Sequence, residues 1–455
     1  MMKMSMDEIL KGINGELILD GKDYDYDTIE TDTRKLQKNS IFIALKGENF
    51  NGNDFILDSI EKGSTICIVS EIKFNIEEIS NGVSIIKVED TKKALLDLAE
   101  TYRNKLNIKI VGITGSTGKT STKDIVAAFL SSKYKVFKTK GNFNNEIGLP
   151  LMMLSLDDSY DIAVLEMGMN NFGEIHNLAK VARPHIALIT NIGISHIENL
   201  KTKENILKAK MEICDFFTKE DILIINKDND MLNTLETKDI NTVSIGVEEK
   251  TSSIKGNNIK LLEDGIIFDV EDNNVVVGTI RLPMVGKHNV LNSLLAYGVC
   301  KEFNVSIEDI NEGIKNLEAT SMRLDILKKE SFTIIDDCYN ASPDSMNAAI
   351  DVLDSLKGRR RVAILGTMRE LGEEAENAHK EIAVYAKKKG IDIIIAVGEY
   401  SSMFKEGFGE DITIFNTTDE CKDNIKYLIK EGDIILIKGS RGMKFEKIVN
   451  KLKEI

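Results

Sequence analysis

Four continuous apolar runs in the middle of the chain predict buried strands. They cover residues 108–114, 161–167, 185–191 and 221–226, and stretches with helical spacing separate them. Strands that are apolar on both faces and alternate with helices are typical of a parallel sheet covered by helices on both sides. The centre of the chain is therefore predicted to be a parallel α/β domain.

The segment before this centre has a different pattern. Short strands at 41–45 and 65–70 are separated by glycine and asparagine turns, and an amphipathic helix follows over about 95–102. The pattern changes again near residue 106, where we place the first domain boundary. A small N-terminal α/β domain is predicted.

The last third of the chain contains a second alternating series. Residues 254–282 have the pattern of β-hairpins, and a helix at about 288–303 closes the central domain. After residue 320 five apolar strands follow one another, separated by helices: 332–337, 360–366, 391–398, 412–416 and 433–439. This series predicts a doubly wound, Rossmann-like domain, although no GxGxxG follows its first strand to indicate a dinucleotide.

The predicted fold class is therefore α/β with three domains. Residues 1–105 form the small N-terminal domain, residues 106–319 the central parallel-sheet domain, and residues 320–455 the C-terminal Rossmann-like domain. A chain of 455 residues is too long for a single core, which agrees with this division.

Composition narrows the classes of partner. A net charge of −14 argues against a protein that tracks nucleic-acid phosphates. The five cysteines have no CxxC spacing, which fits a reducing compartment and suggests neither disulfides nor a zinc site. The first residues lack the apolar core of a signal peptide, and no apolar run approaches the roughly 18 residues that span a bilayer. We expect a cytoplasmic protein without nucleic-acid or membrane partners.

A glycine-rich loop carries the clearest chemistry. Residues 115–120, GSTGKT, follow a predicted strand and open a helix, the context that a phosphate-binding loop requires. Glycines let backbone N–H groups close around phosphate oxygens, and the helix N-terminus adds partial positive charge. Lys119 would reach the β- and γ-phosphates of ATP, and the Thr120 hydroxyl would ligate Mg²⁺. The strict pattern has a glycine where Ile113 stands, so the loop is a variant of it. The alternative is a turn that is merely glycine-rich.

We predict that ATP binds to the following residues: Gly115, Ser116, Thr117, Gly118, Lys119, Thr120 and Ser121.

Two side chains at the ends of central strands are candidates for metal binding or general-base catalysis. Glu166 ends the run 161–167, and His196 lies in the loop after 185–191. The carboxyl ends of parallel strands meet at one edge of a sheet, where ligands of such folds bind. A carboxylate and an imidazole there suit Mg²⁺ or proton transfer, although a glutamate at a strand end is usually only solvated.

Lys210 interrupts an apolar helix face. On a helix predicted over 203–217, it shares one stripe with Ile206, Ile213 and Phe217. The opposite, solvated stripe consists of Glu204, Lys208, Glu212 and Asp215. An uncompensated charge on an apolar face is costly. Either the long side chain reaches outward to water, or the amine is paired or chemically modified.

These motifs resemble the Mur ligase family over nearly the whole chain. The segments that carry the resemblance are 31–55, 114–123, 141–150, 165–175, 191–198, 209–213, 286–296, 336–346, 365–382 and 438–443. Three of them, EMGMN, YNASPDSM and the LGTMRELG stretch, are similar to the family members that add D-alanyl-D-alanine rather than to other Mur ligases or folylpolyglutamate synthases.

The resemblance implies roles for further residues. On the adenosine or phosphate side of ATP it places Asn289, Asn292, Arg323, Asp337 and Tyr339. Toward the uridine nucleotide sugar and its peptide it places Thr33, Arg34, Lys46, Asp54, Asn144 and Asn145. Lys210 falls on the family's carbamylated lysine, which would complete a metal site with Thr120, Glu166 and His196. Departures from the family pattern occur at Asn53, Lys201–Thr202 and Thr367.

The activity implied by the resemblance is ATP-dependent amide ligation in peptidoglycan synthesis, and so in cell wall biogenesis, cell shape and cell division. ATP and Mg²⁺ would convert the terminal carboxylate of UDP-N-acetylmuramoyl-tripeptide to an acyl phosphate, which the amine of D-alanyl-D-alanine would attack. We expect a monomer. Two alternatives stay open: a related ligase with another acceptor, of Mur or folylpolyglutamate type, and a phosphate-loop NTPase switch.

Overall fold

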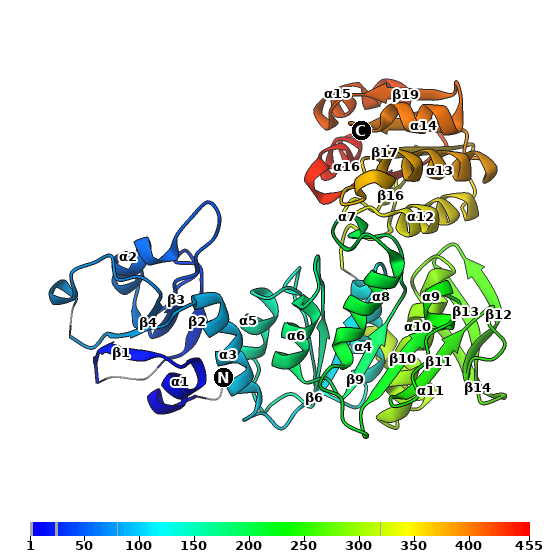
Figure 1. Cartoon of the computed structure of the whole chain (residues 1–455). Coiled ribbons are helices and arrows are strands. Elements are labelled where there is room, and N and C mark those ends of the chain that lie inside the picture. The colour runs from blue at the N-terminus through cyan, green and yellow to red at the C-terminus, as the bar shows by residue number, and fades with distance from the viewer. Residues whose placement is uncertain (1–2, 23–25, 80, 319) are drawn as a thin grey trace. The chain divides into compact units, whose positions relative to one another are not determined.

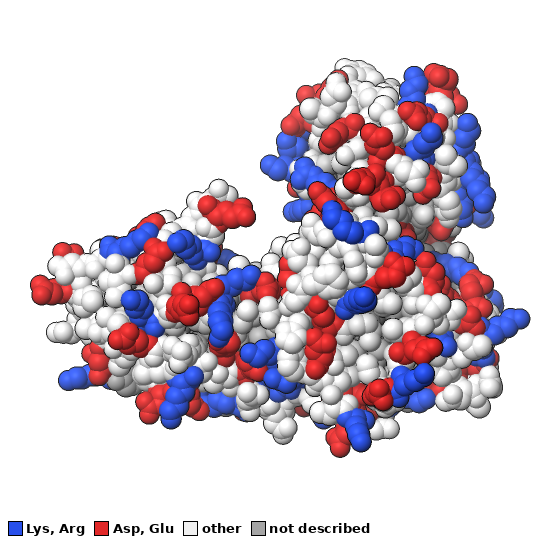
Figure 2. Space-filling model, viewed as in Figure 1, with Lys and Arg blue, Asp and Glu red and all other residues white. Residues whose placement is uncertain are grey.

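The computed structural model describes residues 3–22, 26–79, 81–318 and 320–455. Its strands, among these residues, form three sheets of five, nine and six strands (Figure 1). The predicted α/β class with three sheet-containing regions is confirmed. None of the described helices is both long and apolar enough to cross a bilayer. On the face shown in Figure 2, basic and acidic side chains are interspersed.

The N-terminal sheet has the strand order β1-β5-β4-β3-β2. Its pairs are parallel except for β1, which runs antiparallel to β5. The strands are β1 (Glu16–Leu19), β2 (Thr28–Glu30), β3 (Ser40–Ile43), β4 (Ser64–Val69) and β5 (Ser84–Lys87). The helices are α1 (Met6–Ile13), α2 (Ile56–Glu61) and α3 (Thr91–Arg103).

The nine-stranded sheet has the order β14-β13-β12-β11-β10-β9-β6-β8-β7. The strands are β6 (Lys109–Thr114), β7 (Val136–Lys138), β8 (Ile162–Glu166), β9 (Ile186–Ile189), β10 (Ile222–Asn226), β11 (Asn241–Gly246), β12 (Ile254–Leu262), β13 (Gly265–Asp272) and β14 (Val275–Leu282). The helices are α4 (Lys119–Leu130), α5 (Gly148–Leu154), α6 (Glu174–Ala182), α7 (Ile197–Leu200), α8 (Lys203–Met211), α9 (Asp230–Asn233), α10 (His288–Glu302) and α11 (Ile307–Gly313). All four predicted apolar runs are strands, and the hairpin segment is the antiparallel series β12–β14.

The third sheet has the order β15-β16-β20-β17-β18-β19 and is parallel except for β15. Its strands are β15 (Asp325–Lys328), β16 (Thr333–Asp336), β17 (Arg360–Gly366), β18 (Ile393–Val397), β19 (Ile412–Phe415) and β20 (Asp433–Lys438). The helices α12 (Pro343–Ser355), α13 (Ala375–Lys388) and α14 (Ser401–Phe408) contribute to one apolar core, and α15 (Thr418–Leu428) and α16 (Glu446–Lys453) to another. Alternate residues of β17 enter the two cores, as expected for a sheet covered on both faces.

The chain divides into two compact units that do not coincide with the sheets. One contains residues 1–113, 134–187 and 211–221, and the other contains residues 114–133, 188–210 and 222–455. The first holds Glu166, and the second holds the glycine-rich loop.

Arg103 fixes the end of α3 within the first unit. Its buried guanidinium donates to the carbonyl oxygens of Ala182 (2.9 Å), Leu106 (3.0 Å) and Ile108 (3.3 Å). The Ala182 carbonyl ends α6, where the helix dipole favours a cation. One side chain therefore connects α3, α6 and the start of β6.

Replacing Arg103 with methionine should destabilise this unit. Three buried carbonyls would lose a charged donor, and we expect the free energy of unfolding to fall by about 2–4 kcal/mol. Urea denaturation followed by circular dichroism measures the change, with the exposed Lys219→Met as the matched control. Equal urea midpoints for the two variants would contradict this role.

Candidate active site

The glycine-rich loop has the predicted strand–loop–helix context. It connects β6 to α4, and Gly115 and Gly118 have positive φ angles of 150° and 79°. A Cβ added to Gly115 would lie 1.9 Å from Thr190 Oγ1. Glycine is therefore required at position 115 by a close approach as well as by backbone conformation.

The loop is held by the segment that follows β9, within the same unit. The Thr117 N–H donates to Asn191 Oδ1 (2.8 Å), and the Asn191 side-chain amide donates to Thr117 Oγ1 (2.8 Å). The Ser116 N–H donates to the Asn191 carbonyl (3.0 Å). Thr190 and Asn191 were not predicted as site residues from the sequence. Their position as the polar end of the apolar run 185–191 was the available signal.

Lys119 lies at the start of α4 and turns back toward the loop, where its Nζ donates to the Gly115 carbonyl (2.7 Å). Thr120 follows it and is buried. Asn292, on α10, approaches the loop from another side, since a Cβ on Gly118 would lie 3.1 Å from Asn292 Oδ1. The Asn292 amide also donates to Asn289 Oδ1 (2.9 Å). A cation, a hydroxyl and a helix N-terminus thus surround one glycine loop, an arrangement suited to phosphate.

Lys210 is almost completely buried, with 1% of its surface exposed. Burial, and secondarily the positive charge of Lys119, lowers the pKa of Lys210 well below its usual value. The alternative that the Lys210 side chain reaches outward to water is therefore wrong. The helix is also shorter than expected, because α8 ends at Met211 and a 3₁₀ turn, Glu212–Cys214, follows it.

Glu212, expected on a solvated face, is half-buried in the first unit. Its carboxylate accepts the N–H groups of Gly173 (2.9 Å) and His176 (3.1 Å) at the beginning of α6. Gly173 has no side chain to cap that helix. A carboxylate near a helix N-terminus is favoured by the helix dipole, so Glu212 serves as a remote cap.

His196 begins α7 with a positive φ of 65°. Its Nδ1 lies 2.6 Å from Oε2 of Glu370, which also has a positive φ of 65°. His196 and Glu370 are thus two of the fourteen non-glycine residues in the described parts of the chain that have a positive φ, and here two such residues contact each other.

Glu166 and Asn144 meet in the first unit. Glu166, which is 3% exposed, stands opposite Ile113 in the parallel register of β8 with β6. The Asn144 amide donates to Glu166 Oε1 (2.9 Å), and the Gly168 N–H donates to the Asn144 carbonyl (2.8 Å). A Cβ on Gly168 would lie 3.2 Å from the Asn144 amide group, so glycine leaves room for this side chain.

Asn145 faces a different partner from Asn144. Its Oδ1 accepts the N–H groups of Ile147 (3.2 Å) and Gly148 (2.8 Å), where α5 begins. The Asn145 side chain therefore caps α5. The family resemblance implies a second role for it, in contacting the substrate.

The candidate nucleotide-sugar residues of the first unit are mostly paired and exposed. Arg34 forms two hydrogen bonds to Asp32 (2.9 and 2.7 Å), which hold the pKa of the Asp32 carboxyl at about 2. Lys46 pairs with Glu71 (2.8 Å), and Asp54 pairs with Lys73 (2.9 Å). Thr33, the fourth of these residues, is half-buried.

A residue at each of the three departures from the family pattern makes a hydrogen bond within the protein. Asn53 is buried, and its Oδ1 accepts the N–H groups of Ser70 (3.0 Å) and Glu71 (3.2 Å). The Lys201 Nζ donates to the Glu198 carbonyl (2.6 Å). The Thr367 carbonyl accepts the Ser440 N–H (3.2 Å).

In the C-terminal region, a buried ion pair joins two strand ends. Lys438 Nζ lies 2.5 Å from Asp337 Oδ2 and also donates to the Asn340 carbonyl (3.0 Å). Burial nevertheless raises the pKa of the Asp337 carboxyl. The Arg323 guanidinium stacks 4.3 Å from the centre of the Tyr339 ring. Lys438, in the segment KGSRGM, was missed as an individual residue because only the fold buries it next to Asp337.

Two of the predicted metal ligands are buried oxygen-bearing side chains. Among the described residues, no three His, Cys, Asp or Glu side chains form a group that could hold a metal ion. Glu166 supplies a buried carboxylate, and Thr120 a buried hydroxyl. Oxygen atoms of these kinds fit Mg²⁺.

Comparison with known proteins places these features in one family. Residues 25–103 match the Mur ligase family catalytic domain, residues 113–300 the Mur ligase middle domain, and residues 322–441 the glutamate ligase domain of Mur ligases. The UDP-N-acetylmuramoyl-tripeptide–D-alanyl-D-alanine ligase of Bacillus subtilis is 38% identical, covering 94% of this chain and 93% of the relative. The enzyme of that name from Escherichia coli is 34% identical, covering 100% and 99%.

Solved structures agree with this result. A crystal structure of MurF from Acinetobacter baumannii is 30% identical and superposes with a TM-score of 0.89 over 99% of both chains. The Thermotoga maritima MurF ligase in complex with ADP is 28% identical, with a TM-score of 0.83 over 94% of this chain and 97% of that one.

Replacing Gly168 with alanine should displace Asn144 from Glu166. The added methyl group would meet the Asn144 amide at 3.2 Å, and a shift of even part of an ångström in such a pair is expected to slow ADP formation about tenfold. Steady-state kinetics measure the loss. Asn144→Ala and the double variant are the controls: if Gly168 acts through Asn144, the double variant is no slower than Asn144→Ala. Additive losses would contradict the mechanism.

Proposed function

The chain belongs to the Mur ligase family, and we propose that it is the member that joins D-alanyl-D-alanine to UDP-N-acetylmuramoyl-tripeptide. The observation that carries this assignment is similarity over the full length to relatives of that name, at 38% and 34% identity. The segments EMGMN and YNASPDSM support the same member of the family. The protein then acts in peptidoglycan precursor synthesis, as a cytoplasmic monomer.

The first half-reaction uses the glycine-rich loop. An oxygen of the tripeptide's terminal carboxylate attacks the γ-phosphorus of ATP, the bond from that phosphorus to the bridging oxygen breaks, and ADP leaves. Lys119 and the loop N–H groups offset charge on the β- and γ-phosphates. Such positioning and charge stabilisation account for most catalysis of phosphoryl transfer.

In the second half-reaction the amine of D-alanyl-D-alanine attacks the acyl carbon. The tetrahedral species that results loses a proton to solvent and expels inorganic phosphate, so that an amide bond replaces the acyl–phosphate bond. The acyl phosphate hydrolyses if water reaches it, and exclusion of water is therefore part of the function of the site.

Mg²⁺ would be held by Thr120, Glu166, His196 and the carbamate of Lys210, and it would supply positive charge beside the phosphates. Two observations support this ligand set. The Glu166 carboxylate is 3% exposed, and the burial that lowers the pKa of Lys210 favours the neutral amine that reacts with CO₂.

Substrate dependence of ADP formation tests the assignment. We expect rapid ADP release only when D-alanyl-D-alanine and a UDP-tripeptide are both present, with mass spectrometry showing the joined product. Tripeptides ending in lysine and in diaminopimelate are assayed in parallel. In the same assay, Lys119→Ala should form ADP about 10²–10³-fold more slowly, because an oriented positive charge at the phosphates is lost. ADP release independent of both substrates would identify an NTPase switch, and a product with another amino acid would identify a different ligase.

Lys210 should act as a carbamate, formed when its neutral amine bonds to the carbon of CO₂ and loses a proton. Lys210→Ala should be slower by at least about 10²-fold because an oxygen ligand is lost. Acetate should restore part of that rate, whereas the exposed Lys208→Ala should keep full activity with or without acetate. An undiminished rate in Lys210→Ala, or crystals grown with bicarbonate and ATP that contain an unmodified lysine, would refute carbamylation.

A further inference from the structure

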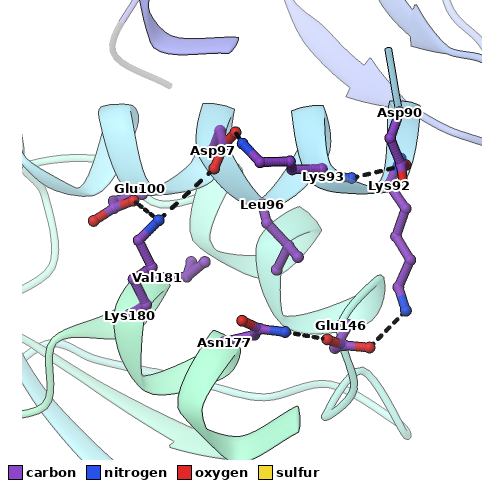
Figure 3. Close-up of a pocket in the computed structure, with 10 residues that line it drawn as sticks. All are labelled: Asp90, Lys92, Lys93, Leu96, Asp97, Glu100, Glu146, Asn177, Lys180 and Val181. Carbon is purple, nitrogen blue, oxygen red and sulfur yellow. Dashed lines mark hydrogen bonds and ion pairs between the residues drawn. The ribbon is translucent and has the colours of Figure 1, made fainter. Parts of the chain in front are cut away.

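Glu146 lies directly after Asn144 and Asn145, in the loop between β7 and α5. Both of its carboxylate oxygens are used: Oε2 accepts from Lys92 Nζ (2.6 Å), and Oε1 accepts from the Asn177 amide (2.7 Å). The Glu146 side chain is only 16% exposed. Figure 3 shows these contacts, with Lys92 on α3 and Asn177 on α6.

The two contacts border a cavity of about 340 Å³ that also contains other ion pairs. Lys93 pairs with Asp97 within α3, and Lys180 of α6 pairs with Glu100 of α3 (3.0 Å). Those pairs stay within a helix or join helix to helix. Among the described residues that line this cavity, Glu146 comes from the loop and connects it to both helices (Figure 3).

The loop that Glu146 holds also carries the partner of Glu166. Asn144, two residues earlier, donates to Glu166 Oε1 and receives the Gly168 N–H through its carbonyl. Asn145 caps α5. Three successive residues therefore fix the loop to β8, to α5 and to α3 with α6.

The α3 end of this connection belongs to the N-terminal region. Lys92 lies in the first turn of α3 and within residues 25–103, the part that matches the Mur ligase family catalytic domain. Under the proposed function, that region holds the uridine nucleotide sugar. The Lys92–Glu146 pair is thus a direct link between the sugar-binding region and the loop that orients Glu166.

We propose that Glu146 is a positioning residue for the UDP-tripeptide: through Lys92 it sets the N-terminal region in register with the Asn144–Glu166 pair. The proposal rests on the proposed function. A substrate held at both places binds well only if their spacing is fixed in advance, because mobility would add an entropic cost to binding. Loss of the link should therefore weaken binding of the UDP-tripeptide selectively and leave binding of ATP unchanged.

A double-mutant cycle tests this coupling in the full-length enzyme. Glu146→Gln and Lys92→Met should each raise KM for the UDP-tripeptide about tenfold, the effect of one charge-assisted hydrogen bond, while KM for ATP changes less than about twofold. The double variant should be no worse than either single one. The reversed pair, Lys92→Glu with Glu146→Lys, should recover most of the loss.

Lys93→Met is the matched control. Lys93 neighbours Lys92 on α3 and faces the same cavity, but its ammonium pairs with Asp97 and not with the loop, so KM should stay at the wild-type value. Thermal unfolding is measured for every variant. A lowered melting temperature with an unchanged KM for the UDP-tripeptide would overturn the proposal, and so would additive effects or equal rises in both KM values.

The proposal can still be tested if the Glu146 variants fold poorly. Lys92 is about half exposed, at 49%, so Lys92→Met keeps the fold and carries the same expectation alone. Failure of the proposed function is distinct, because wild-type enzyme would then release no ADP in response to the UDP-tripeptide and D-alanyl-D-alanine.

Discussion

The parallel pairing of β6 with β8 is the interaction that places Glu166. Its backbone register sets Ile113 opposite Glu166, and the chain beyond β6 turns at Gly115 into the phosphate loop. Hydrogen bonds between strands fix this correspondence independently of any side chain. The apolar residues of both strands, buried on each face, then hold the register, because a slip by one residue would exchange the two faces.

Three ionisable side chains of the candidate site residues and their neighbours are buried. Glu166, Lys210 and Lys438 are each at most 3% exposed. Placing a charge out of water is costly unless it is paired or neutralised, and these groups meet that requirement differently. Lys438 is paired with Asp337, whereas burial lowers the pKa of Lys210 well below its usual value. A lysine whose pKa is lowered by burial, as that of Lys210 is, occurs preferentially at functional sites.

The loop of residues 141–147 illustrates how closely structural and substrate roles are interleaved. Asn144, Asn145 and Glu146 are adjacent and polar, yet their side chains face β8, α5 and the pair of helices α3 and α6. A loop without regular secondary structure becomes rigid when successive side chains satisfy different elements. Rigid positioning of this kind is what a ligase needs to align two substrates and ATP.

The sequence by itself determined the α/β class, the central strands and the phosphate loop, because each leaves a local pattern: continuous apolar runs, and glycines next to Lys119 and Thr120. It also identified Lys210 as out of place, since one polar residue in an apolar stripe is visible in a single helix. Short β7 was missed because three residues carry too little pattern. The end of α8, the remote cap by Glu212 and the link through Glu146 were decided only by tertiary structure. The two side-chain contacts join residues more than 30 positions apart, and the end of α8 depends on competition between neighbouring elements. Such long-range effects leave no periodic pattern in the local sequence.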